Sequence, residues 1–292
     1  MVVALLRALA RLPLRSMHAL GALLGWIAYL GSPVYAARMR ANLRQSGIAA
    51  TDDEYRRLLR CAIAEAGKSL IEVIAVWWRD ERDAARLVLE CENLEAGLAA
   101  QRRGKGVILL TPHLGCFEVC AIYAAQHLPI TVLYRPPHLR WLEPLMITGR
   151  GRGRVRLATT DLWGVRKLYV ALRQAEAVGL LPDQAPGAGD GVWADFFGRP
   201  AYTMTLATRL HQSTGAAMFL AFAERLPKGR GYRIRLRELC ADVRDPAQLN
   251  RAIEELIRLC PEQYLWGYNR YKTPAGARKK DEGRRMKSEG GG

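Results

Sequence analysis

The sequence is poor in cysteine and in acidic residues, and both shortages exclude classes of protein. Six cysteines in 292 residues form no CxxC pair, so neither a dense disulfide framework nor a zinc site with paired cysteine ligands is predicted. Reduced cytosolic thiols are the simplest interpretation. Asp and Glu number 28 against 44 Lys and Arg, a formal net charge of +16. This excess predicts an anionic partner, such as phosphate headgroups, nucleic acid or an acidic protein, without choosing between them.

Two functional motifs are also missing. The chain has no GxSxG nucleophile elbow, which argues against a serine hydrolase. Its basic residues are not interleaved with aromatic side chains in a recognisable nucleic-acid-binding module. We therefore predict that nucleic acid is not a partner.

The N-terminus has a long stretch without charge. Residues 17–37 contain no Asp, Glu, Lys or Arg, and this length is sufficient to span a bilayer. Before it, Arg7, Arg11 and Arg15 recur on one helical face, a pattern typical of an interfacial helix. We predict a membrane-associated helical segment over residues 1–44, either spanning or monotopic. A cleaved signal peptide and a buried core helix are the alternatives.

Residues 45–272 have the pattern of one α/β domain. Short apolar runs alternate with helical patterns, which predicts a mixed sheet flanked by helices. The predicted strands cover residues 107–111, 130–134, 178–181, 217–222 and, near a sheet edge, 232–237. The predicted helices cover about 51–78, 118–127, 162–175, 204–213 and 246–259. Residues 273–292 are rich in Lys, Arg and Gly, so we predict a disordered basic tail.

Polar side chains directly follow four of the predicted strands. These residues are His113, Arg135, Asp183 with Gln184, and Glu224 with Arg225. In open α/β sheets ligands bind beyond the carboxyl ends of the strands. We therefore expect these residues to converge on one crevice.

His113 and Glu118 form an H-x4-E motif. On one regular helix, residues five apart point about 140° away from each other. The chain must therefore bend between them, and Pro112 and Gly115 favour a strand-to-helix turn. From the first helical turn, the Glu118 carboxylate is expected to reach back and orient the His113 imidazole as a general base. The alternative is a structural histidine beside a helix-capping glutamate.

A basic cluster follows at Arg150, Arg152, Arg154 and Arg156, interleaved with two glycines. Guanidinium groups bind phosphate in a bidentate manner. The cluster is either a flexible phosphate clamp or a solvated surface loop.

In this order, the pieces resemble the lipid A biosynthesis acyltransferase family, whose late enzymes add a secondary acyl chain to a Kdo-containing lipid A precursor. The resemblance covers nearly the whole chain. It rests on the apolar N-terminus with Asn42 in the basic stretch behind it, residues 111–118 (Thr-Pro-His-Leu-Gly-Cys-Phe-Glu), Tyr134-Arg135-Pro136, Pro182-Asp183-Gln184, Phe196-Phe197-Gly198, Thr203 or Thr205, and residues 261–266 leading to Arg270-Tyr271-Lys272.

The resemblance implies acyl transfer from an acyl-acyl carrier protein co-substrate, without a metal or organic cofactor. It places the enzyme at the cytoplasmic face of the inner membrane, with acyl carrier protein and an anionic glycolipid as partners. His113 and Glu118 would be catalytic. The substrate-binding residues would be Arg135, Arg150, Arg152, Asp183, Gln184 and Arg270.

Two departures from the family pattern stand out. Many relatives have Asn-Trp-Glu or Asn-Phe-Glu where this chain has Cys116-Phe117-Glu118, so the side chain at 116 is not expected to be essential. Many also have His-Arg-Arg where this chain has Tyr268-Asn269-Arg270, which leaves acceptor recognition open. The alternatives are acylation of a lysophospholipid or aminolipid, and a non-catalytic basic membrane-binding protein.

Overall fold

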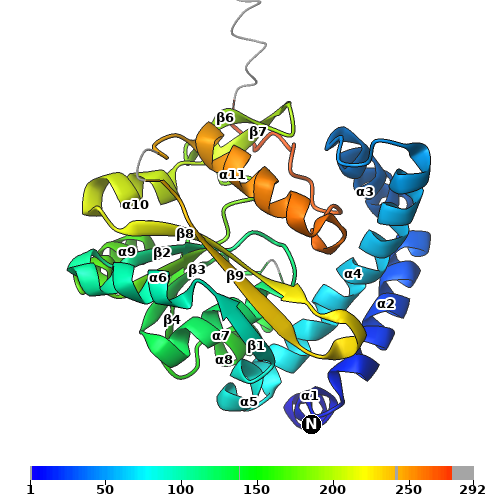
Figure 1. Cartoon of the computed structure of the whole chain (residues 1–292), viewed down its shortest axis with the longest axis horizontal. Coiled ribbons are helices and arrows are strands. Elements are labelled where there is room, and N and C mark those ends of the chain that lie inside the picture. Colours follow the sequence, from blue (N-terminus) through cyan, green and yellow to red (C-terminus); the bar gives the residue numbers. More distant parts are fainter. Residues whose placement is uncertain (1, 138, 241–242, 278–292) are drawn as a thin grey trace, which may run out of the picture.

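One seven-stranded sheet organises the chain, for which the computed structural model describes residues 2–137, 139–240 and 243–277 (Figure 1). The strand order is β1-β9-β8-β2-β5-β3-β4, and every neighbouring pair is parallel except β8 and β9. The strands are β1 (Val88–Glu92), β2 (Val107–Leu110), β3 (Ile130–Tyr134), β4 (Val155–Thr159), β5 (Ala177–Leu180), β8 (Ala217–Arg225) and β9 (Tyr232–Glu238). A separate hairpin joins β6 (Gly191–Phe196) to β7 (Arg199–Met204).

Helices cover both faces of this sheet. The chain forms α1 (Val2–Ala10), α2 (Leu14–Gly31), α3 (Pro33–Gln45), α4 (Asp52–Trp78), α5 (Glu81–Ala85), α6 (Leu94–Ala100), α7 (Phe117–His127), α8 (Glu143–Arg150), α9 (Leu162–Arg173), α10 (Leu206–Thr214) and α11 (Pro246–Leu259). Short turns of helix lie at Gln101–Lys105, Arg140–Leu142, Pro227–Gly229 and Pro261–Gln263.

The two faces of the sheet have separate cores. On one face Ile108 and Leu110 of β2 pack with residues of α9, α10 and α11. On the other face α7 packs on β3, β4 and β5 through residues such as Val119 and Ile122. Because side chains alternate along a strand, Leu109 of β2 points towards α7, whereas Ile108 and Leu110 point to the other face.

Helix α2 packs closely against α4, as Figure 1 shows along one side of the molecule. The contact is made by Gly21 and Gly25 of α2 against Gly67 of α4. A Cβ atom at Gly67 would lie 2.0 Å from the Gly21 carbonyl oxygen. Small residues at this crossing let the two backbones approach, and the opposite side of α2 stays exposed.

None of the described helices is by itself long and apolar enough to cross a membrane. Only α2 and α3 together pass a test of length and composition, and they are bent by 104°. The predicted membrane association of residues 1–44, like the division of the chain into segments, therefore stays a prediction. Most of the predicted basic tail, residues 278–292, lies outside the described residues.

The predicted mixed sheet flanked by helices is confirmed, and so are the predicted strands and helices to within a few residues. The capping box at Thr51 and Glu54 begins α4 as expected. The sequence patterns missed β1, β4 and the β6–β7 hairpin. Strand β4 was missed because it contains Arg156 and follows other arginines, which made the segment look like a basic loop. An edge strand can carry such charged side chains on its solvated face.

Candidate active site

His113 lies in the turn between β2 and α7, and the backbone of this turn is fixed from several sides. Gly115 has a φ of +63°, and a Cβ atom there would lie 2.0 Å from the Ala223 carbonyl oxygen. The Cys116 amide donates to that same oxygen at 2.8 Å, and the Gly115 amide donates to Gln263 O at 3.1 Å. Only glycine combines this conformation with so close an approach. The predicted bend at Gly115 is confirmed.

The imidazole of His113 bonds to residues that follow β5, the neighbour of β2 in the sheet. Its Nδ1 lies 2.9 Å from Asp183 Oδ1, and its backbone amide donates to Asp183 Oδ2 at 3.0 Å. Its Nε2 lies 3.0 Å from the side-chain nitrogen of Gln184. The expected convergence of strand ends is confirmed for His113, Asp183 and Gln184.

The charge state of Asp183 fixes the histidine tautomer. Burial would raise the pKa of Asp183, but the neighbouring His113 and the hydrogen bonds that it donates hold that pKa below its ordinary value. An ionised carboxylate only accepts hydrogen bonds, so His113 Nδ1 must carry a proton. Nε2 is then the basic nitrogen, and it accepts from the Gln184 amide. The His113 side chain is 13% exposed, whereas that of Asp183 is 3% exposed.

Glu118 does not make the predicted hydrogen bond to His113 among the described residues. Its carboxylate accepts from Arg150 Nε at 2.9 Å and from Trp77 Nε1 at 2.9 Å, with a second ion-pair contact to Arg150. Burial would raise the pKa of Glu118, and the Arg150 guanidinium beside it lowers that pKa below its ordinary value. Glu118 lies in the first turn of α7, and its side chain reaches Arg150 at the end of α8. Asp183, predicted to bind substrate, is the carboxylate that holds His113.

The four arginines of the basic cluster bond to different parts of the protein, and phosphate binding by them stays a prediction. Arg150 pairs with Glu118, whereas Arg152 donates to the carbonyl oxygens of Val76, Arg79 and Gly149. Arg154 donates to Ala125 O, and Arg156 pairs with Glu176. These contacts tie α8 and β4 to their neighbours. Arg135 is exposed at the end of β3.

Arg270, predicted to bind substrate, bonds to scaffold residues, and its role towards substrate stays a prediction. It is 2% exposed. Its guanidinium donates to Tyr202 O at 2.8 Å, and to the side chains of Thr203 and Asn250 at 2.7 and 3.3 Å. These bonds connect the C-terminal segment to β7 and α11, while the buried Arg270 Nε has no hydrogen-bond partner among the described residues.

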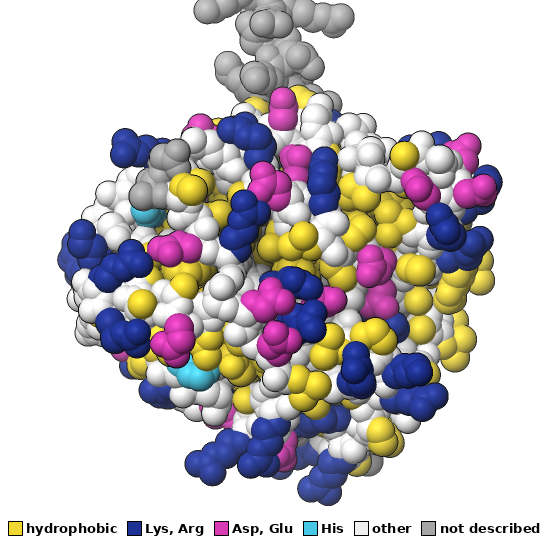
Figure 2. Space-filling model, viewed as in Figure 1, with side chains coloured by type: hydrophobic (Ala, Val, Ile, Leu, Met, Phe, Trp, Pro, Cys, Tyr) yellow, Lys and Arg dark blue, Asp and Glu magenta, His cyan; other side chains and the backbone are white. Residues whose placement is uncertain are grey.

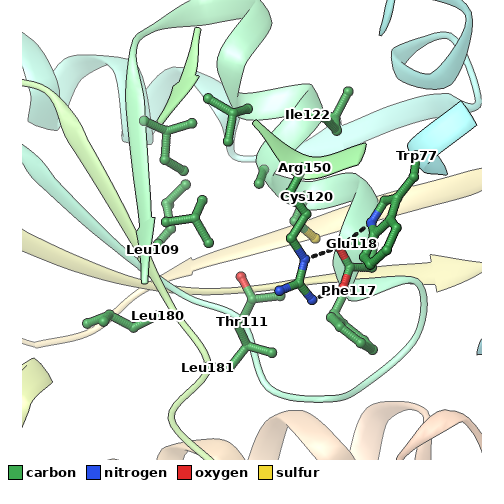
Figure 3. Close-up of a pocket in the computed structure, with 15 residues that line it drawn as sticks. Trp77, Leu109, Thr111, Phe117, Glu118, Cys120, Ile122, Arg150, Leu180 and Leu181 are labelled. Atoms are coloured by element: carbon green, nitrogen blue, oxygen red, sulfur yellow. Dashed lines mark hydrogen bonds and ion pairs between the residues drawn. The ribbon is translucent and has the colours of Figure 1, made fainter. Parts of the chain in front are cut away.

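An apolar pocket opens beside the turn that carries His113 (Figure 3). It holds about 570 Å³ of empty space, including its open end. Thr111, Phe117 and the Glu118–Arg150 pair line one part of it. The rest is mostly aliphatic, with Trp77 and Cys120 beside Leu109, Ile122, Ile130, Val132, Val155 and Leu180. Phe117 also packs on His113, with ring centroids 4.7 Å apart. The pocket therefore joins the histidine turn to a hydrocarbon-lined space.

A second ionic cluster, not anticipated from the sequence, lies behind the turn. Arg225, at the end of β8, bonds to Glu72 at 2.8 Å and to the Gly115 carbonyl oxygen at 2.9 Å. Glu72 also bonds to His18 of α2 at 2.8 Å. Arg225 was noticed in the sequence because it follows a predicted strand, whereas no local pattern indicates a role for His18 or Glu72. Among the described residues, no group of three or more His, Cys, Asp or Glu is placed to hold a metal ion.

Comparison with known proteins gives consistent matches. A family model described as bacterial lipid A biosynthesis acyltransferase matches residues 1–273. The chain is 27% identical over 273 residues to the lipid A biosynthesis lauroyltransferase of Escherichia coli K12, which covers 90% of this chain and 87% of that protein. It is 29% identical over 228 residues to the lipid A biosynthesis palmitoleoyltransferase of the same organism, covering 76% and 73% of the two chains. A lipid A biosynthesis acyltransferase of Shigella flexneri matches equally well.

Proposed function

Because the chain belongs to the bacterial lipid A biosynthesis acyltransferase family, we propose that it transfers a fatty acyl chain from acyl-acyl carrier protein to a hydroxyl of a Kdo-lipid IVA-type precursor. The observation that carries this proposal is the His113–Asp183 pair beside an apolar pocket. A base and a hydrocarbon-lined space are the two features that acyl transfer to a hydroxyl requires.

In the proposed reaction, His113 Nε2 takes the proton of the acceptor hydroxyl. The oxygen then attacks the thioester carbonyl carbon, the carbon–sulfur bond breaks, and the proton passes from His113 to the departing thiolate. Asp183 keeps Nδ1 protonated and stabilises the imidazolium that forms. The Gln184 amide, 3.0 Å from Nε2, occupies the place of the acceptor hydroxyl and moves aside when the acceptor binds.

Negative charge develops on the thioester oxygen during this attack. Arg150 lines the pocket beside the turn, and its side chain is 21% exposed. Helix α7 begins without a side-chain cap, so amide groups of its first turn are available to an anion. Both features support stabilisation of the oxyanion, with Glu118 holding Arg150 in place.

The exposed side of α2 supports attachment to a membrane surface. Leu20, Leu23, Ile27 and Leu30 recur on one face and are all exposed, Leu30 at 73%. In Figure 2 hydrophobic side chains gather along the edge occupied by α2, and Lys and Arg side chains lie towards α1. This arrangement suits an interfacial helix on anionic lipid. We propose the cytoplasmic face of the inner membrane, where a basic protein also meets the acidic carrier protein.

Mass spectrometry of the lipid product tests the proposal. The protein in membranes is incubated with acyl-acyl carrier protein and an under-acylated Kdo-bearing precursor, with the donor omitted as control. A mass gain of one acyl chain on the precursor is expected. A gain on lysophospholipid instead would support the alternative acceptor class, and no gain on either lipid would favour a non-catalytic membrane-binding protein.

A further inference from the structure

The sheet face beneath α7 contains a second apolar pocket next to the first. It holds about 530 Å³ of empty space, including its open end. It lies between α6, α7 and strands β1, β2, β8 and β9, on the side away from β3 and β4. Its lining is apolar apart from the side chains of Cys91, Cys120, Tyr123 and His127. No part of the proposed reaction uses this second pocket.

The two pockets share two lining residues, Leu109 of β2 and Cys120 of α7. One lies on the sheet and the other on the helix that covers it, in the same apolar cluster, so together they form a partition that separates the two pockets. Cys120 is buried, and Leu109 is partly exposed although β2 is the central strand. A central-strand leucine borders open space only where the layer above it is incompletely packed.

Small side chains explain why this layer is incompletely packed. The second pocket is lined by Ala124 of α7, Ala177 of β5 and Ala221 of β8. The opposite face of β8 carries large side chains, such as Leu220 and Phe222. Protein interiors are normally filled to the density of organic crystals, and persistent empty space with an apolar lining accepts apolar ligands.

We propose that Leu109 and Cys120 set the maximum length of the acyl chain, with the second pocket as the space into which a longer chain would extend. This inference rests on the proposed function, because the first pocket must hold the chain whose thioester lies at His113. From the turn, a chain runs past Phe117 along α7 and meets the partition. Chains that end before the partition fit, and longer ones must bend or displace it.

Removal of the partition tests this inference. Wild-type protein, Leu109→Ala, Cys120→Ala and the double variant are assayed with saturated donors from decanoyl to stearoyl. In each partition variant, kcat/KM for the longest donor divided by kcat/KM for the preferred donor should rise about tenfold. An apolar pocket discriminates between chain lengths by a factor of this order. Adding Ala124→Leu to the double variant refills the second pocket and should reverse the gain.

The matched control is Leu110→Ala, which removes the same atoms from the neighbouring residue on the opposite face of β2. It should lower thermal stability but keep the wild-type ratio. An unchanged ratio in both partition variants, or an equal change in Leu110→Ala, would overturn the inference while leaving acyl transfer intact. Absence of transfer by the wild type with every donor would instead overturn the proposed function and the inference with it.

Discussion

Two histidines of this protein each bond to a buried carboxylate, yet their surroundings differ. His113 lies 2.9 Å from Asp183, and His18 lies 2.8 Å from Glu72. Glu72 is shared with Arg225 and Tyr232 in a closed cluster. Asp183 instead holds a histidine whose other ring nitrogen bonds, among the described residues, to the Gln184 amide beside the apolar pocket. Under the proposed function, a histidine–carboxylate pair is therefore not sufficient for catalysis, because the second ring nitrogen must also be accessible to substrate.

Asp183→Asn should produce the largest effect in this comparison. The amide keeps the shape of the carboxylate, but it no longer fixes the proton on Nδ1 or stabilises the imidazolium. We expect kcat to fall about a thousandfold with KM changed little. Steady-state kinetics with acyl-acyl carrier protein checks this result. A rate near that of the wild type would mean that Asp183 does not orient the base.

Arg225→Met should instead act mainly on stability. It leaves the buried carboxylate of Glu72 without the Arg225 guanidinium that neutralises it. Breaking a buried ion pair in this way costs about 3–5 kcal/mol of unfolding free energy. Chemical denaturation measures the loss. A stability within about 1 kcal/mol of the wild type would show that water or local rearrangement compensates this charge.

Protonation of Glu72 in acid should lower the free energy of unfolding. Burial would raise the pKa of Glu72, but Arg225 and His18 lower it from 4.5 to about 2. A depressed pKa stabilises the fold fully above the ordinary value, and this contribution of about 3 kcal/mol is lost as pH falls from 4.5 towards 2. Denaturation across this range should show the loss in the wild type and a shallower dependence in Glu72→Gln. Parallel profiles would contradict this assignment.

His18→Gln should have the smallest effect. Glutamine still offers an N–H group towards Glu72, so the expected loss of stability is about 1 kcal/mol. The acyl-transfer rate per folded molecule should be unchanged, because His18 lies in the closed cluster. Thermal unfolding and the transfer assay check both statements. A strong loss of rate would mean that α2 controls the catalytic turn through this cluster.

The strands and helices that carry the site residues were predicted from the sequence more accurately than the contacts between those residues. The positions of His113 and Asp183 just beyond two strands were predicted correctly, because a run of apolar residues and the polar residue that ends it are visible in the local sequence. The partner of His113 depends on β2 and β5 being neighbours, and strand order is not encoded by local pattern. The H-x4-E spacing pointed to Glu118, whereas the direction of its side chain depends on Arg150 at the end of α8. Arg270 looked like a ligand-binding cation because its burial is a property of the assembled fold.

The most direct test of the central claim compares His113→Ala with His18→Gln in single-turnover acyl transfer to the lipid A precursor. We expect His113→Ala to lose about ten-thousandfold in rate while remaining folded and bound to membranes. His18→Gln should retain the wild-type rate. If His113→Ala kept most of its activity, the open histidine would not be the base, and the account of this site would be contradicted.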